Sequence, residues 1–326
     1  MAVLGTIATS ALLTTGIHYI QKSSRPVFEN EAPVNEASAC DYKISRLSGY
    51  KFTRPLMYAE PGSPAAEFSS LQNEVNSKIQ AFKVNGTIKR ASVYIREFSN
   101  GKWTSINDSE KFSPGSLLKI PELIAFFKMN EKQPGLLNKK LSVKQYFAYA
   151  KKTHFPTQSI ELNKEYSIRE LLYYMIRYSD NNATMLLNQY LDEAVFKKVF
   201  TDLGMAEPNM RSSDFKLTAK EFSVFMKVLY NASYLNIHDS ETCLEMMSEG
   251  DFKNGLLAPI PSQLPVAHKF GEGGADSSPN FSETAIVISG SRAFLVTIMT
   301  EGNDLLKLPE VTKSISQTVF DQMTKS

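Results

Sequence analysis

The order of helix-forming and strand-forming segments constrains the fold of this 326-residue chain more than any other feature. Apolar residues recur at helical spacing over 67–84, and two strand-like segments follow at 91–98 and 102–106. A mostly helical stretch then covers about 120–263. Three more strand segments and a final helix end the chain, at 266–270, 285–289, 293–300 and 308–323. This order predicts an α+β fold, in which an antiparallel five-stranded sheet is flanked by terminal helices and carries an inserted helical domain.

Local signals place the boundaries of these elements. Asn85-Gly86 is expected to end the first helix, and Asn100-Gly101 is typical of a hairpin turn between the first two strands. Gly290-Ser291-Arg292 is expected to join the last two strands. Within the insert, helical periodicity predicts helices at 120–130, 142–151, 167–177, 180–191, 194–203 and 218–231.

The N-terminal segment differs from the rest of the chain, because residues 2–20 contain no Asp, Glu, Lys or Arg. Its length suits a signal peptide or a membrane anchor. The nearest positive charges, Lys22 and Arg25, follow the segment instead of preceding it, so a buried or disordered N-terminal segment is the alternative. We expect residues 1–22 to be a signal peptide or anchor, 23–60 a linker and 61–326 the folded domain. This organisation predicts an extracytoplasmic protein, either secreted or attached to a membrane.

Charge and cysteine content narrow the possible partners. The 36 basic and 34 acidic residues give a net charge of +2 without a basic block, which argues against nucleic-acid binding. Cys40 and Cys243 do not have metal-ligand spacing, and a disulfide between them is left open. His18, His154 and His238 are scattered, so we expect no metal site.

A serine and a lysine lie three residues apart at the predicted start of the first inserted helix, at Ser116 and Lys119. Residues at this spacing share a helix face. A desolvated, neutral lysine can take the proton of a serine hydroxyl, and free N–H groups at a helix N-terminus stabilise developing negative charge. The same spacing also occurs at Ser48, Ser99 and Ser213, so the pair alone does not define a site.

Two further motifs accompany this pair. Ser179-Asp180-Asn181 lies at a break between two predicted helices, and Lys269-Phe270-Gly271 lies on a predicted strand. Taken singly, the first is ordinary helix-capping chemistry and the second an edge-strand lysine with a turn glycine. Their occurrence together, in this order and at fitting element ends, favours a shared active site.

With these three motifs, residues 67–323 resemble the penicillin-recognising active-site serine enzymes, most of all the class A β-lactamase-like serine hydrolases. The resemblance implies a β-lactamase/transpeptidase-like fold and a bacterial protein without a cofactor. It also implies a small-molecule substrate, either a β-lactam or a peptidoglycan-type peptide. We expect a monomer.

The resemblance also implies roles for particular residues. Ser116 is the expected acylated nucleophile, Lys119 its proton-relay partner, and Ser179 the hydroxyl that passes a proton to the departing amine. Asn181 is expected to orient the substrate's side-chain carbonyl, and Lys269 to attract its carboxylate.

Backbone groups complete the site that the resemblance implies. Gly271 would let the strand approach the ligand closely, because glycine has no Cβ. The backbone N–H groups of Ser116 and Glu272 would form the oxyanion hole, in which each donor typically contributes about 10²–10³ in rate.

The sequence departs from the family pattern at the step that releases the product. Class A β-lactamases carry Glu-x-x-x-Asn, whose glutamate activates the hydrolytic water, whereas here Asn209 follows Glu207 by two residues. Glu207 is therefore a possible deacylation base, with Glu272 and Glu283 as alternatives. Phe270 also replaces the usual hydroxyl residue of the third motif.

These observations support three hypotheses. The first is a serine hydrolase that forms an acyl-enzyme on Ser116 with a β-lactam or related amide and hydrolyses it. The second is a cell-wall D,D-peptidase or an esterase built on the same site. The third is a penicillin-binding sensor or a non-catalytic homologue with impaired deacylation.

Overall fold

The computed structural model describes residues 42–50, 52–148, 150, 153–155, 158–209 and 215–325. They belong to one compact unit, Asp41–Ser326. The predicted signal peptide or anchor at 1–22 and the first part of the predicted linker lie outside the described residues. Of the helices that the described residues form, none is both long and apolar enough to cross a membrane.

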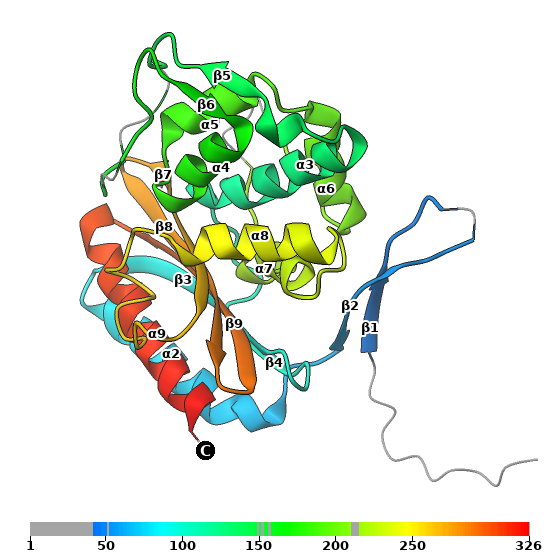
Figure 1. Ribbon diagram of the computed structural model, residues 1–326. Coiled ribbons are helices and arrows are strands. Elements are labelled where there is room, and N and C mark those ends of the chain that lie inside the picture. Colours follow the sequence, from blue (N-terminus) through cyan, green and yellow to red (C-terminus); the bar gives the residue numbers. More distant parts are fainter. Residues whose placement is uncertain are drawn as a thin grey trace, which may run out of the picture. The chain divides into compact units, whose positions relative to one another are not determined.

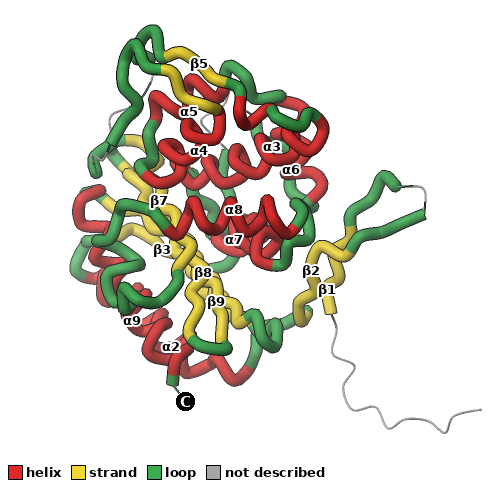
Figure 2. The backbone as a smooth tube through the Cα atoms, viewed as in Figure 1, coloured by secondary structure: helices red, strands yellow, loops and turns green. Residues whose placement is uncertain are grey.

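A five-stranded antiparallel sheet forms the centre of the unit, with the strand order β4-β3-β9-β8-β7 (Figures 1 and 2). The strands are β3 (Ile88–Glu97), β4 (Trp103–Ile106), β7 (Val266–Ala275), β8 (Ser278–Ser289) and β9 (Arg292–Gly302). The predicted sheet is therefore confirmed. The end of β7, residues 271–275, was not predicted as strand, because Gly-Glu-Gly-Gly-Ala has no hydrophobic alternation; its backbone nevertheless pairs with β8.

The first and last long helices cover one face of this sheet. Helix α2 (Ser69–Val84) packs against α9 (Leu308–Thr324), and both cover a hydrophobic cluster that includes Val93 and Ile95 of β3. Between those two residues, Tyr94 belongs to the cluster on the other face, as the two-residue period of a strand requires. The sheet thus separates two hydrophobic cores.

The helical lobe packs on the opposite face through α7 and α8. Its helices are α3 (Lys119–Lys132), α4 (Ile168–Arg177), α5 (Asn181–Asn188), α6 (Glu193–Asp202), α7 (Ala219–Tyr230) and α8 (Ile237–Ser248). Helix α7 contacts β9 and β3, and α8 contacts β7. The sequence did not single out α8.

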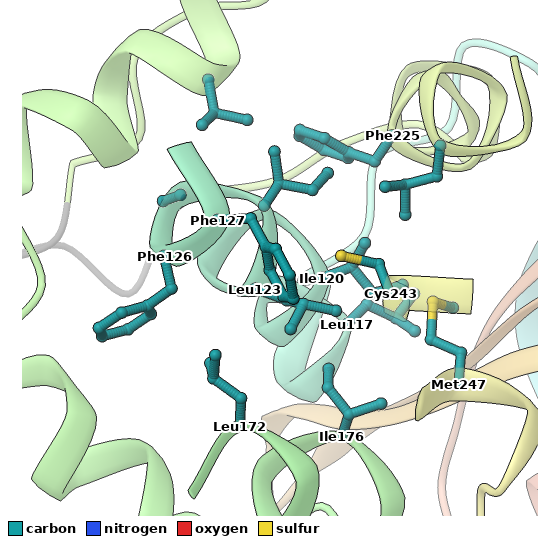
Figure 3. Packing of buried hydrophobic residues seen from close by; sticks show 14 of the residues in the cluster. Leu117, Ile120, Leu123, Phe126, Phe127, Leu172, Ile176, Phe225, Cys243 and Met247 are labelled. Carbon is teal, nitrogen blue, oxygen red and sulfur yellow. The ribbon is translucent and has the colours of Figure 1, made fainter. Parts of the chain in front are cut away.

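Helix α3 is the buried centre of this lobe. Each residue over its first nine positions, 119–127, is buried, which is typical of a helix surrounded by other elements. Figure 3 shows side chains of α3 packed among those of α4, α7 and α8, including Ile176, Phe225 and Met247. Cys243 is a free, fully buried thiol in the same cluster, and Cys40 lies outside the described residues.

The predicted helix at 142–151 is wrong. Strand β5 (Lys140–Ser142) pairs with β6 (Glu165–Ser167), and the described residues 143–148 and 150 are turns or irregular. Leu141 and Val143 are buried while Ser142 between them is exposed, so the burial period here is two. The short length of the pair concealed this alternation.

A hairpin replaces the second half of the predicted linker 23–60. Strand β1 (Tyr42–Arg46) pairs with β2 (Leu56–Pro61), so the compact unit begins before residue 61. Glu60 fixes the hairpin to the domain, because its Oε2 accepts hydrogen bonds from Lys227 Nζ at 2.8 Å and Arg96 Nη1 at 3.1 Å. Sequence patterns do not reveal such a long-range ionic anchor.

Candidate active site

Ser116 lies in a 3-10 turn, η2 (Gly115–Leu118), that leads directly into α3. The turn is pressed against β7. A Cβ atom on Gly115, whose φ is +52°, would fall 2.0 Å from the carbonyl oxygen of Glu272. A Cβ atom on Gly271 would fall 2.7 Å from both the amide nitrogen of Leu117 and the carbonyl oxygen of Pro114. Glycines on both segments therefore let the backbone of β7 reach the serine turn.

Lys119 is the first residue of α3, and only 3% of it is exposed. Its amine donates hydrogen bonds to Ser179 O at 2.6 Å, Ser179 Oγ at 3.2 Å and Asn181 Oδ1 at 2.7 Å. Burial lowers the pKa of Lys119 to about 8, against the opposing charges of carboxylates nearby. The lysine thus joins the first two motifs and is easier to deprotonate than an exposed lysine.

Lys269 reaches the same hydroxyl from β7. Its amine donates to Ser179 Oγ at 3.0 Å and to the carbonyl oxygen of Phe270 at 2.8 Å. Burial, reinforced by the charge of Lys119, lowers its pKa well below the usual value. The three motifs therefore meet at the Ser179 side chain, which receives a hydrogen bond from each of two buried lysines.

Ser179 adopts a left-handed backbone conformation, with φ of +53°. This conformation costs a non-glycine residue on the order of 1 kcal/mol, so neighbouring contacts must maintain it. Asp180 supplies them: it caps α5 through the Asn182 N–H and accepts from Ser159 Oγ at 2.9 Å and the Ile160 N–H at 2.8 Å. Asp180 therefore holds the loop and caps α5.

A cleft of about 1190 Å³ opens over these residues. Ser116, Lys119, Asn181 and the stretch around Glu272 line it. Ser179 and Lys269 are buried directly behind the lining, at 0% and 1% exposure. The site therefore has a partly exposed serine and the buried Lys119 at the cleft, with Lys269 behind them. Among the described residues, no group of three His, Cys, Asp or Glu side chains is placed to hold a metal ion.

A sequence model described as the β-lactamase enzyme family matches residues 74–323, a range that includes all three motifs. The chain belongs to the β-lactamase enzyme family. This assignment confirms the family predicted from the motifs. No curated protein sequence gives a significant match.

Solved structures agree with the fold of this family. PBP-A is 18% identical, with a TM-score of 0.63, and the match covers 78% of this chain and 96% of PBP-A. A class A β-lactamase from Mycobacterium abscessus is 20% identical, with a TM-score of 0.64 and coverage of 78% and 100%. A β-lactamase from Chitinophaga pinensis is 18% identical, with a TM-score of 0.66 and coverage of 78% and 99%. The β-lactamase/transpeptidase-like fold is thus confirmed.

Not every residue that the sequence suggested for the active site lies at the cleft. Glu207 is exposed and is not among the residues that line the cleft. Glu283 is fully buried away from the lining, where it accepts from the Leu256 N–H at 2.7 Å and contacts His268 Nε2 at 2.9 Å. Phe270 is 3% exposed and packs with aromatic side chains of the core that α2 and α9 cover.

Two features of the site were not apparent from the sequence. The carboxylate of Glu272 accepts hydrogen bonds from the backbone and ring nitrogens of His154, at 3.0 and 2.8 Å. Glu122, three residues after Lys119, lines the cleft from within α3. Burial raises the pKa of Glu122 to about 7, although the charge of Lys119 opposes the shift. The available signal was a carboxylate inside an apolar run, Ile120–Phe127.

Proposed function

We propose that this member of the β-lactamase family forms an acyl-enzyme on Ser116 with a β-lactam or a related amide, and hydrolyses it. One observation carries the proposal: the amines of Lys119 and Lys269 both bond to Ser179 directly behind the cleft that Ser116 lines. A serine nucleophile, a lysine with lowered pKa and a bridging hydroxyl are the groups that acyl transfer needs.

Acylation begins when neutral Lys119 takes the proton of Ser116 Oγ. The oxygen then bonds to the substrate carbonyl carbon, and negative charge develops on the carbonyl oxygen. The backbone N–H groups of Ser116 and Glu272 are the proposed donors to that oxygen, and β7 approaches closely enough to the serine turn for this role.

Collapse of this intermediate breaks the carbon–nitrogen bond. The departing nitrogen takes the proton of Ser179 Oγ, and the ammonium of Lys119 returns a proton to Ser179 along their 3.2 Å hydrogen bond. Lys119 is then neutral again, and the acyl group remains on Ser116. Lys269, bonded to the same hydroxyl, keeps Ser179 polarised throughout.

Asn181 and Lys269 are the proposed substrate-binding groups. Asn181 lines the cleft, and its Oδ1 accepts from Lys119, so its amide can donate to a substrate carbonyl. Lys269 lies behind the cleft, and in its protonated form it would attract a substrate carboxylate. The related PBP-A has been solved, as a mutant, in an acyl-enzyme complex with penicillin G. We propose the same class of ligand here.

A penicillin-binding peptidase or sensor is the second candidate function. The exposure of Glu207 outside the cleft favours it, because the loop carboxylate expected to release the acyl group is absent from the site. Such a protein would acylate Ser116 and then transfer or keep the acyl group.

One experiment separates these functions. The full-length protein is mixed with a chromogenic cephalosporin, and both turnover and intact protein mass are followed over time. Turnover with a transient adduct supports hydrolysis, and a persistent adduct supports a peptidase or sensor. If neither turnover nor an adduct is observed, acyl transfer is contradicted. Ser116→Ala should abolish both signals. Ser99→Ala, at another Ser-x-x-Lys match on an exposed turn, should change neither.

We also propose that residues 1–22 export the domain or anchor it outside the cytoplasm. The proposal rests on the uncharged run at 2–20. Cell fractionation of the expressed full-length chain tests it: recovery in the extracytoplasmic or membrane fraction is expected, and recovery solely in the cytoplasm would contradict it.

A further inference from the structure

We propose that Glu122 is the general base that activates water to hydrolyse the acyl group on Ser116. This inference rests on the proposed acylation of Ser116. It names a base for deacylation, a step that Glu207 cannot serve because it lies outside the cleft lining. It assigns a catalytic role to a carboxylate on the central helix of the lobe.

The position of Glu122 follows from the spacing of the helix. Ser116, Lys119 and Glu122 succeed one another at intervals of three, so they form a row along one side of η2 and α3. The three residues line the same cleft, together with Asn181 and Thr184 of α5. We place the hydrolytic water in this part of the cleft, between the carboxylate of Glu122 and an acylated Ser116.

The carboxyl group of Glu122 is buried without a full set of partners. The residue is 5% exposed, and its Oε2 has no hydrogen-bond partner among the described residues. An unsatisfied buried acceptor is unfavourable, and the surrounding residues of Ile120–Phe127 are apolar, so packing alone would favour a leucine here. This oxygen lies just beneath the surface of the cleft that Glu122 lines, so a small rotation of the side chain would present it to a molecule there.

Electrostatics near Glu122 suit a proton acceptor at neutral pH. Burial raises its pKa to about 7, and the charge of Lys119 is the force that opposes this rise. Lys119 in turn faces the carboxylates of Asp180 and Glu272 and the amine of Lys269. A general base works best when its pKa lies near the working pH.

The step balances as follows. The carboxylate of Glu122 takes one proton from water while the water oxygen bonds to the acyl carbon. When the tetrahedral intermediate collapses, the bond between that carbon and Ser116 Oγ breaks. Glu122 gives its proton to Lys119, and Lys119 gives a proton to Ser116 Oγ. The serine, the lysine and the carboxylate all return to their starting states.

The three carboxylates that the sequence offered as deacylation bases are engaged or displaced. Glu272 lines the cleft, but its Oε2 accepts from the backbone N–H of His154 and contacts His154 Nδ1, and its Oε1 accepts from the Phe155 N–H. Glu283 is buried outside the lining, and Glu207 is exposed outside it. Glu122 therefore combines access to the cleft with a vacant buried oxygen.

The test separates acylation from deacylation in Glu122→Gln, which retains the shape of the side chain but cannot accept a proton. Intact mass after rapid quenching gives the acylation rate with a cephalosporin, and decay of the adduct gives the deacylation rate. We expect deacylation to slow by about 10²–10⁴-fold, whereas acylation changes less than about tenfold because Lys119 remains. Glu131→Gln, at the exposed end of the same helix, is the matched control and should change neither rate.

Two further measurements distinguish catalysis from a structural role. In the unaltered protein, deacylation should rise with pH through about 7, the pKa of Glu122. In Glu122→Ala, added formate should restore part of the deacylation rate by supplying a carboxylate to the vacated space. Unchanged deacylation in Glu122→Gln, or its loss in Glu207→Gln, would overturn the assignment.

The outcomes also separate this role from the proposed function. If Ser116 of the unaltered protein is acylated and the adduct persists, the hydrolytic role of Glu122 fails while acyl transfer stands. If no β-lactam adduct forms, the proposed function fails and the role of Glu122 fails with it.

Discussion

Lys119 Nζ and Asn181 Oδ1 lie 2.7 Å apart, a hydrogen bond that connects the first residue of α3 to the first residue of α5. The same amine bonds to both oxygens of Ser179. Because these contacts cross between elements sixty residues apart, they hold the serine turn and the Ser179 loop in one fixed arrangement. Acylation as proposed depends on this arrangement and on the lowered pKa of the lysine.

The acylation rate should increase with pH through about 8. Burial lowers the pKa of Lys119 to about 8, and only the neutral amine, which predominates above that pH, can accept the Ser116 proton. Single-turnover acylation measured by quenched mass analysis between about pH 6 and 10 tests this expectation. Lys119→Ala should remove this increase of the rate with pH and slow acylation by about 10²–10⁴-fold. A flat profile through pH 8 in the unaltered protein would contradict the role of the lysine.

Gly271→Ala should impair acylation by more than its effect on stability explains. The added Cβ would lie 2.7 Å from the Leu117 nitrogen, so either β7 or the serine turn must move. We expect a loss of about 1–3 kcal/mol in unfolding free energy from this overpacking, with a marked fall in acylation rate.

Gly135→Ala is the matched control for that substitution. Its φ of +91° makes alanine unfavourable, yet a Cβ there meets no atom within 4 Å and the residue is not in the cleft lining. The control should lose stability, by roughly 1 kcal/mol, and retain the acylation rate. Equal acylation rates in the two variants would show that the approach of β7 to Ser116 is unimportant.

Glu60→Gln should destabilise the protein by about 3–5 kcal/mol at neutral pH, because it leaves the buried cations Lys227 and Arg96 without their counter-charge. Burial alone would raise the pKa of Glu60, but the nearby cations lower it below the usual value of 4.5. Its ion-pair contribution is thus complete at neutral pH and is lost as pH falls below 4.5 through the lowered pKa.

Chemical denaturation at several pH values measures this contribution. The difference in unfolding free energy between the unaltered protein and Glu60→Gln should shrink as the pH falls. Glu60→Gln combined with Lys227→Met should be more stable than Glu60→Gln alone, because one uncompensated charge is removed. A pH-independent difference would contradict the ion-pair account.

The sequence predicted the sheet, most of its flanking helices and the three motifs, because each depends on local periodicity or on short spacing. Long-range pairing explains most of what it missed. The hairpin at 42–61 depends on Glu60 meeting Lys227 and Arg96, and the glycine-rich end of β7 forms strand because β8 lies beside it. The error at 142–151 arose where a short strand pair gave too few residues for its period to be evident.

At the site, sequence patterns identified the residues but not their contacts. Lys119 was expected beside Ser116, and the structure adds its bonds to Ser179 and Asn181. Glu122 could have been noticed as a carboxylate in an apolar run, but its vacant oxygen and its place in the cleft lining require coordinates. Glu207 was a candidate because Glu207 and Asn209 partly resemble the Glu-x-x-x-Asn motif. The structure does not place Glu207 in the cleft lining.

Locating the covalent adduct tests directly whether Ser116 is the nucleophile. The full-length protein is treated with a β-lactam, quenched in acid, digested and examined by peptide mass analysis. We expect one acyl group on the peptide that contains Ser116, and none in the Ser116→Ala variant. An acyl group attached elsewhere, or an unmodified Ser116 peptide at every time point, would contradict it.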